Sequence, residues 1–132
     1  MREWRMKLPI GEFKLIKLGL KKIEGRAALD SDVNKKFSEM EKGNLLIFEA
    51  VDENKKILDE ETLAFEVLFN NCYKGNSEDA IREMFEKEGL KKLLPNCDSI
   101  EEGVKIYMGF PGYPKRISEF GIYAIGLGKQ IK

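Results

Sequence analysis

The sequence predicts an α+β fold, a small mixed β-barrel of about five to six strands with helices packed across its openings. Two observations lead to this prediction. Short segments with the period-two alternation of strands are interspersed with only a few amphipathic helical segments. In addition, the charged turn "VDENKKILDEE" and the breaker "PGYP" leave no room for the repeated crossovers of a parallel α/β sheet.

The first part of the chain predicts a strand, a short helix and a second strand. In "EWRMKL", residues 3–8, apolar residues alternate with charged ones, as in a half-buried strand. After Pro9 the apolar residues are spaced as in a helix, and the helix should end at Gly19. From Lys22 the period of two returns, so a second strand would carry Glu24 and Arg26 on one side.

The middle of the chain predicts a β-hairpin. Residues 30–42 are polar and should form a long loop before the apolar, β-prone run "NLLIFEAV". A charged hairpin turn over residues 52–61 then leads to the strand "TLAFEVLFNNCY".

The last part predicts two helices and a closing strand. "SEDAIREMFEKEGL" should begin with Ser77 as N-cap and end at Gly89. In "SIEEGVKIYMGF", Ser99 and Glu102 form the S-x-x-E capping box, and "PGYP" should end that helix. The alternating, apolar "FGIYAIGLG" is typical of a central strand.

Length and charge limit the classes of function. A chain of 132 residues makes about one domain, so we expect residues 1–132 to form a single domain, acting as a monomer. The 23 basic and 23 acidic residues cancel, so any contact with nucleic acid must come from a local basic patch. No apolar run approaches the roughly 18 residues of a membrane helix, and the charged N-terminus is unlike a signal peptide, which indicates a cytoplasmic protein without a membrane partner.

The residue types predict neither a metal site nor a cofactor. The chain has no histidine, and Cys72 and Cys97 lie far apart without a C-x-x-C pair, so a zinc site would lack its usual ligands. We expect both cysteines to be reduced, buried thiols. Without histidine, any catalysis would have to use Lys, Glu, Asp, Tyr or a hydroxyl group.

Five segments in order resemble an ASCH domain, a member of the PUA-like superfamily. They are "EWRMKL", "GLKKIEGR" with the pattern G-x-K-x-x-E-x-R, "GNLLIFE", "EMFEKEGLKKLLPNCDSIEEGVKIY" and "FGIYAIGL", which together span nearly the whole chain. The resemblance implies a small PUA-like barrel with a cleft beside the G-x-K-x-x-E-x-R strand. It also implies an RNA-related role, as in coactivator-associated and RNA-processing modules. A bacterial branch of similar domains hydrolyses the acetyl amide of N4-acetylcytidine.

The sequence departs from the family pattern in three places. Gly43-Asn44 stands where most relatives have Gly-Asp, so a carboxylate often found beside the cleft is missing. The loop over residues 30–42 and the hairpin turn look longer than in compact relatives. Glu24 stands where the amidohydrolase branch has the threonine proposed as its nucleophile. Lys21 matches the catalytic lysine of that branch, and Glu88, or with less support Glu86, falls near its catalytic glutamate.

Each candidate side chain has a functional and a structural interpretation. Lys21 could contact a phosphate or carbonyl group in the cleft, or lie exposed on the surface. Glu24 and Arg26 could together hold the edge of a base, or form a structural ion pair. Tyr107 falls on the apolar stripe of its helix, which favours core packing over a hydroxyl in the cleft, and Trp4 is expected in the core. Three basic pairs could form a rim around a phosphate path: Lys35 and Lys36, Lys91 and Lys92, and Lys115 and Arg116.

Three functions from different classes follow. The preferred one is a module in which Lys21, Glu24, Arg26 and Tyr107 bind RNA or a modified nucleoside. The second is an amidohydrolase acting on N4-acetylcytidine-like nucleosides, with Lys21 as base and Glu88 polarising the substrate or transferring a proton. The third is a coactivator-type protein-interaction module, favoured by the zero net charge.

Overall fold

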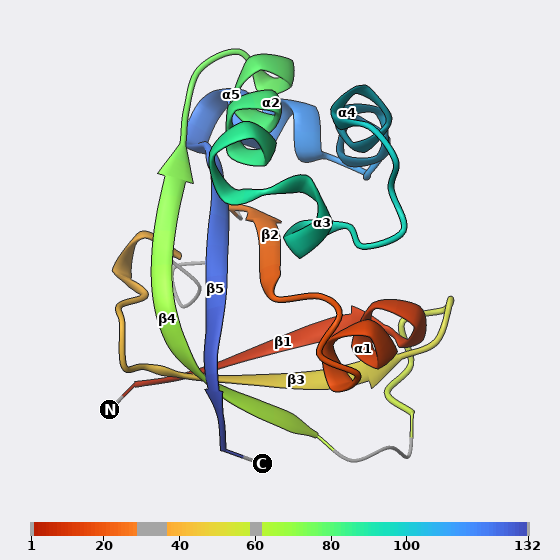
Figure 1. Cartoon of the computed structure of the whole chain (residues 1–132), viewed down its shortest axis with the longest axis vertical. Coiled ribbons are helices and arrows are strands. Elements are labelled where there is room, and N and C mark those ends of the chain that lie inside the picture. Colours follow the sequence, from red (N-terminus) through yellow and green to blue (C-terminus); the bar gives the residue numbers. More distant parts are fainter. Residues whose placement is uncertain (1, 29–36, 59–61, 132) are drawn as a thin grey trace.

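A computed structural model describes residues 2–28, 37–58 and 62–131. Its five strands form one mixed sheet in the order β1-β3-β4-β5-β2, curled into a half-barrel that helices cover, so the predicted α+β class is confirmed (Figure 1). β1 and β3 pair in parallel, and the other neighbours pair antiparallel. The strands are β1 (Glu3–Pro9), β2 (Ile23–Ala27), β3 (Leu45–Val51), β4 (Leu63–Tyr73) and β5 (Ile122–Gln130).

The helices gather in two places. α1 packs beside β1 and β3, whereas α2, α4 and α5 form a layer at the other end of the molecule (Figure 1). The sheet therefore has one apolar cluster at each end, one shared with α1 and the other with the helical layer. The helices are α1 (Ile10–Lys17), α2 (Ser77–Glu88), α3 (Leu90–Leu93), α4 (Ile100–Met108) and α5 (Tyr113–Phe120), with a 3-10 turn η1 (Phe37–Glu39).

β4 is the strand that curls the sheet. Its first residues pair with β3 and its later ones with β5, and register shifts interrupt the second pairing between Phe65 and Phe69. Such irregularities bend a strand and increase its twist. On β5, Gly126 lies under the ring of Phe69, where a Cβ atom would overlap the ring. The bend lets one strand join the two halves of the half-barrel.

Several predicted elements are confirmed with small corrections. α1 ends near Gly19, whose φ of +76° favours glycine, and the Ser99 side chain accepts a hydrogen bond from the Glu102 amide at the start of α4. The predicted N-cap Ser77 is wrong: Asn76 caps α2 by accepting from the Glu78 amide, and Ser77 is the first helical residue. The longer loop predicted over residues 30–42 and the turn over residues 52–61 fall partly outside the described residues.

Two expectations need correction. α4 ends at Met108, just before the "PGYP" segment, and that segment begins α5, because a proline in the first turn of a helix costs no hydrogen bond. Cys97 is buried as predicted, but Cys72 is exposed near the end of β4, where its thiol lies 3.9 Å from the Phe120 carbonyl at the end of α5. Both cysteines are free thiols.

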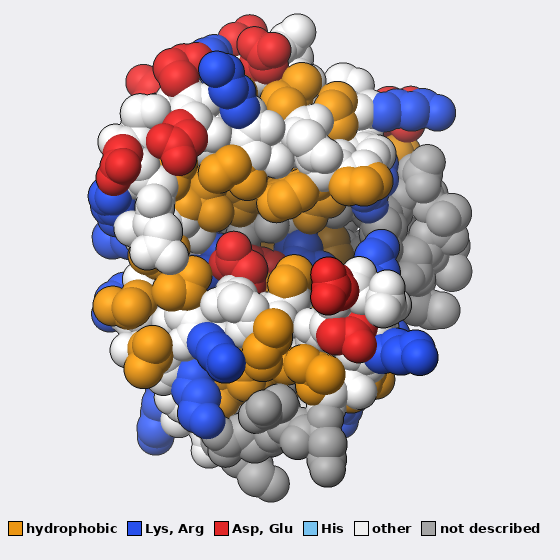
Figure 2. Space-filling view, turned by 90° about the vertical axis from the view of Figure 1, so that its right-hand side faces the viewer, with side chains coloured by type: hydrophobic (Ala, Val, Ile, Leu, Met, Phe, Trp, Pro, Cys, Tyr) orange, Lys and Arg blue, Asp and Glu red, His pale blue; other side chains and the backbone are white. Residues whose placement is uncertain are grey.

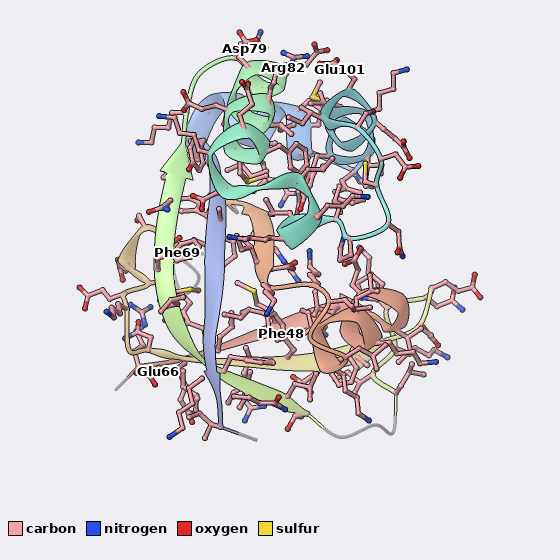
Figure 3. The ribbon with its side chains drawn as sticks, viewed as in Figure 1. Phe48, Glu66, Phe69, Asp79, Arg82 and Glu101 are labelled. Carbon is pink, nitrogen blue, oxygen red and sulfur yellow. The ribbon has the colours of Figure 1, made fainter. Side chains whose placement is uncertain are left out.

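An ion-pair group ties the helices of the covering layer together. Arg82 of α2 makes two contacts with Glu101 of α4, Nε to Oε1 at 2.9 Å and Nη2 to Oε2 at 3.1 Å. Asp79 adds a third contact at 3.4 Å, and all three residues lie at the outer end of the layer (Figure 3). Among the described residues, no helix has the length and apolar character needed to cross a membrane.

Candidate functional site

A cleft of about 300 Å³ opens between the two edge strands of the half-barrel, β1 and β2. Figure 2 shows a hollow across this face, with charged side chains inside it and a row of hydrophobic side chains along one border. Its volume lies at the lower end of the range for small-molecule sites. The cleft is lined by Lys7, Leu8, Pro9, Glu12, Lys21, Glu24, Gly25, Arg26, Lys55, Leu94, Tyr107, Phe110, Pro111, Tyr113 and Arg116.

Lys21 and Glu24 form a buried charged group at the base of the cleft. Their exposed fractions are 3% and 5%, and they are the charged residues classed as buried within the described chain. Nζ of Lys21 donates to the Leu93 carbonyl at 2.5 Å and lies 3.4 Å from Oε1 of Glu24. It also lies 3.6 Å from Oε2 of Glu12 on α1. Lys21 is therefore no exposed surface lysine, because three acceptors converge on its ammonium group.

Arg26 connects the two edges of the sheet. Its Nε donates to Oε2 of Glu24 at 2.7 Å, so the predicted Glu-Arg pair forms. Its Nη2 donates to the carbonyl of Lys7 on β1, also at 2.7 Å. Because β1 and β2 lie at opposite ends of the strand order, this side chain joins the two edges of the half-barrel across the cleft.

The charges of this group stabilise one another. Burial by itself would raise the pKa of Glu24, but the neighbouring Arg26 and Lys21 outweigh burial and hold that pKa below its usual value. Burial likewise opposes the charge of Arg26, but Glu24 raises the arginine pKa above its usual value. The pair therefore stays ionised although little solvent reaches it.

Tyr107 belongs both to the core and to the cleft. It is 2% exposed, and its ring packs against Phe85 of the core and Phe110 at the cleft. Its hydroxyl lies against Gly25 of β2, where a Cβ atom would overlap it. Burial, and after it the charge of Glu24, raise the pKa of Tyr107 well above its usual value, so this hydroxyl keeps its proton.

Sequence reasoning missed the aromatic and basic wall of the cleft, built by residues 110–116. The rings of Phe110 and Tyr113 meet edge to face with centroids 5.1 Å apart, and Phe110 is 39% exposed. The guanidinium carbon of Arg116 lies 5.0 Å from the Tyr113 ring centroid, and its Nη2 donates to the Pro111 carbonyl. The run "FPGYPKR" carried the signal: its Lys115 and Arg116 were predicted as part of a basic rim, but its aromatic residues were interpreted only as part of a helix breaker.

Two further lining residues come from segments that the motif does not include. Glu12 lies in the first turn of α1. Lys55 lies in the turn after β3, with a φ of +63°. The side chain of Asp52 holds this turn by accepting from the amides of Asn54 and Lys56.

Glu88 does not join the other predicted residues. Its Oε2 accepts from the Tyr73 hydroxyl at 2.5 Å and from the Asn71 amide group at 2.7 Å, both on β4. The last turn of α2 thus directs this carboxylate toward β4, and Glu88 does not line the cleft. The alternative Glu86 is exposed on the same helix.

Other predicted residues have structural roles or lie elsewhere. Trp4 is buried as predicted, and its indole donates to Oδ1 of Asn44 at 3.0 Å. Asn44, the departure from Gly-Asp, thus supports the core and does not line the cleft. Of the three predicted basic pairs, Arg116 lines the cleft, whereas Lys91, Lys92 and Lys115 do not, and residues 35–36 are outside the described part of the chain.

The lining is electropositive although the whole chain is neutral. Five basic residues, Lys7, Lys21, Lys55, Arg26 and Arg116, face two acidic ones, Glu12 and Glu24. No group of three or more His, Cys, Asp or Glu side chains suited to a metal ion occurs among residues 2–28, 37–58 and 62–131. The cleft therefore combines an excess of positive charge with exposed aromatic edges.

The fold and the cleft together define a small half-barrel protein with a buried Lys-Glu-Arg group between its sheet edges. No protein-family model matches the sequence, and no curated protein matches it significantly. Two solved structures are similar over nearly their whole length. Hypothetical protein PH0355 is 34% identical with a TM-score of 0.70, and the match covers 96% of this chain and 97% of that one. Protein PF0455 from Pyrococcus furiosus is 34% identical with a TM-score of 0.65, and the match covers 98% of both chains. The chain belongs to the same family as these two proteins.

Proposed function

We propose that the cleft binds either a nucleotide within RNA or a free modified nucleoside. The observation that carries the proposal is the combination of the Phe110–Tyr113 aromatic wall with five basic side chains in one cleft. Aromatic faces and edges stack with or pack against bases, whereas Lys and Arg neutralise phosphate groups. This local excess of positive charge compensates for the zero net charge of the whole chain.

We further propose that the chain is an ASCH domain of the PUA-like superfamily. The residues that match G-x-K-x-x-E-x-R, namely Lys21, Glu24 and Arg26, all line the cleft. Their position supports the resemblance, which implied a cleft beside this strand. The sheet curled into a half-barrel, with helices across it, is in keeping with the same superfamily.

The geometry gives less support to the amidohydrolase alternative. Glu88 contacts β4 and does not line the cleft, so it would not share a substrate with Lys21. Nζ of Lys21 has two carboxylates and a carbonyl within 3.6 Å, and these acceptors favour a bound ammonium group over a general base. Glu24 pairs with Arg26 and has no hydroxyl to replace the threonine nucleophile.

The test is binding of a short single-stranded RNA as a function of salt concentration. Replacing Lys7 and Lys55 together by glutamine removes two lining charges that make no recorded ion pair in the described structure. Each phosphate contact contributes about 0.7 to the slope of log K against log salt for single strands, so the double variant should lower the slope by about 1.4. A matched control is the double replacement of Lys74 and Lys87 by glutamine, because both lysines are exposed and outside the cleft.

Four outcomes decide between the proposal and its alternatives. A lower slope and weaker binding in the cleft variant alone would support nucleotide binding there. Equal losses in both double variants would show that RNA binds through general charge and would overturn the cleft assignment. No binding of RNA or nucleosides by the wild-type protein would overturn the proposal and favour the protein-interaction alternative. Release of cytidine from N4-acetylcytidine by the purified protein would instead support the hydrolase.

A further inference from the structure

The carboxylate that sequence reasoning assigned to base recognition is already engaged with protein groups. Oε1 of Glu24 lies 3.4 Å from Nζ of Lys21, and Oε2 accepts from Nε of Arg26 at 2.7 Å. With an exposed fraction of 5%, Glu24 presents little surface to a ligand. Its main role is to hold Lys21 and Arg26 in place, so another group in the cleft must accept hydrogen bonds from a ligand.

Glu12 has such an acceptor. Its Oε2 is buried and has no hydrogen-bond partner among the described residues. Nζ of Lys21 lies 3.6 Å away, which attracts the carboxylate electrostatically but exceeds hydrogen-bond distance. The Glu12 side chain as a whole is 34% exposed, so the carboxylate, unlike that of Glu24, presents surface to a ligand in the cleft. Hydrogen bonds to a charged acceptor are stronger than those to a neutral one.

The surroundings of Glu12 limit what this donor can be. The lining has five basic residues against two acidic ones, so a cationic ligand would be repelled. A neutral N–H group on a planar ring meets both requirements, because Phe110, Tyr113 and Glu12 line the same cleft: the ring would pack against the two aromatic side chains and the N–H would donate to the carboxylate. Attached phosphate groups would be attracted by the basic side chains.

We infer that Glu12 is the specificity-determining residue of the cleft, and that it selects nucleotides whose base carries an exocyclic amino group. The inference rests on the proposed nucleotide-binding function and names the residue and the ligand group that give it selectivity. The amino group donates to the exposed part of the Glu12 carboxylate, and no covalent bond is made or broken. The motif residues Glu24 and Arg26 shape the cleft, while Glu12 reads the base.

The test compares nucleotides that differ only in the amino group. CMP is compared with zebularine 5′-monophosphate, and AMP with purine riboside 5′-monophosphate, because each second member has hydrogen in place of the amino group. Dissociation constants are measured by isothermal titration calorimetry with the full chain. A hydrogen bond to a charged acceptor predicts about tenfold or tighter binding of the amino member in at least one pair.

Glu12→Gln should remove most of that preference, because the neutral amide accepts a weaker hydrogen bond. It should leave the binding of the amino-free analogues within about twofold, since stacking and phosphate contacts do not depend on Glu12. The matched control is Glu86→Gln, on an exposed part of α2 outside the cleft, which should keep the full preference. Circular dichroism and thermal unfolding show whether each variant is folded.

The outcomes separate this inference from the proposed function. If amino and amino-free members of both pairs bind equally, the cleft binds nucleotides without this selectivity and only the role of Glu12 is overturned. If the preference is present but survives Glu12→Gln, another acceptor provides it and the assignment to Glu12 is wrong. If none of the four nucleotides binds, and RNA does not bind either, the proposed function and this inference both fail.

Discussion

Glu24 lies almost out of reach of solvent between two cations, and its ionisation should affect the stability of the protein. Lys21 and Arg26 hold its pKa in the folded state below the usual value of 4.5, although burial opposes them. A carboxylate whose pKa is lower in the folded state stabilises the protein above its unfolded pKa. This contribution is lost as pH falls through the folded pKa, so the relevant window lies below about pH 4.5.

Glu24→Gln should lower the free energy of unfolding by about 3 kcal/mol at neutral pH, because it leaves the buried Lys21 and the partly buried Arg26 without their shared carboxylate. The difference between wild type and variant should shrink as pH falls below about 4.5, where the wild-type carboxylate also becomes neutral. Urea unfolding at a series of pH values measures both effects. Parallel pH profiles for the two proteins would contradict the ionised state of Glu24, and the exposed Glu86→Gln provides a control that should change stability little.

Gly25 has a steric role that the sequence motif leaves unspecified. A Cβ atom there would overlap the Tyr107 hydroxyl and come within 3.1 Å of Leu93 Cδ2. Gly25→Ala should therefore cost about 1–3 kcal/mol, as overpacking does in a tight core. Adding Tyr107→Phe removes the overlapping oxygen and should recover part of that loss. Denaturant unfolding of the two single variants and the double variant gives the coupling energy, and strictly additive effects would argue against the contact.

Among the elements, α2 shows how a helix start depends on one side chain. The sequence analysis placed the N-cap at Ser77, but Asn76 is the residue whose side chain accepts from the Glu78 amide, at 3.1 Å. Asn76→Ala should lower stability by about 1 kcal/mol, whereas Ser77→Ala should change it by a few tenths. Thermal or urea unfolding of both variants checks this. An equal or larger loss for Ser77→Ala would show that the helix begins one residue later.

At the scale of elements, α5 matters most for the site. Its first turn and the residues just before it contribute Phe110, Pro111, Tyr113 and Arg116 to the cleft. Arg116 holds this wall by donating to the carbonyls of Pro111 and Gly112. A helix that sequence reasoning did not predict thus provides the aromatic and basic surface on which the proposed function depends.

At the scale of the whole molecule, the two edge strands of the half-barrel, β1 and β2, both line the cleft. Arg26 joins them by its contact with the Lys7 carbonyl on β1 and its pair with Glu24 on β2. Because the sheet order puts β1 and β2 at opposite edges, no backbone ladder connects these two strands. The geometry of the cleft should therefore respond to loss of this one side chain.

Arg26→Gln should cost about 2–3 kcal/mol, because the shorter amide cannot make both charged contacts. Hydrogen exchange should accelerate at the amides of β1 and β2 more than in α2, since the change releases the sheet edges locally. Exchange measured by NMR on the folded protein tests this. Arg5→Gln is the matched control on β1. The Arg5 side chain is 61% exposed, and its ion pair with Glu49 is long, at 4.0 Å. A surface pair of this kind contributes less than about 1 kcal/mol to stability. Uniform acceleration across the molecule would contradict the local role of Arg26.

The sequence by itself determined the elements whose signal is local. The alternation of "EWRMKL", the Gly19 stop and the Ser99 capping box each report on neighbouring residues, and the strands and helices form there. The Glu24–Arg26 pair followed from a spacing of two on one strand. These features depend on backbone preference and on residues a few positions apart.

Only the tertiary structure decided which distant groups meet in the cleft. Glu12, Lys55 and Arg116 come from three separate segments, and no periodicity in the sequence reports their convergence on β2. Glu88 was expected near Lys21 but contacts β4, because the rotation of α2 on the sheet sets the direction of its last turn. The physical reason is that local propensity fixes each element, whereas the meeting of two sheet edges depends on packing across the whole chain. The motif strand was visible in the sequence, but the acceptor that we assign to base recognition became visible only when the fold brought Glu12 of α1 within 3.6 Å of Lys21.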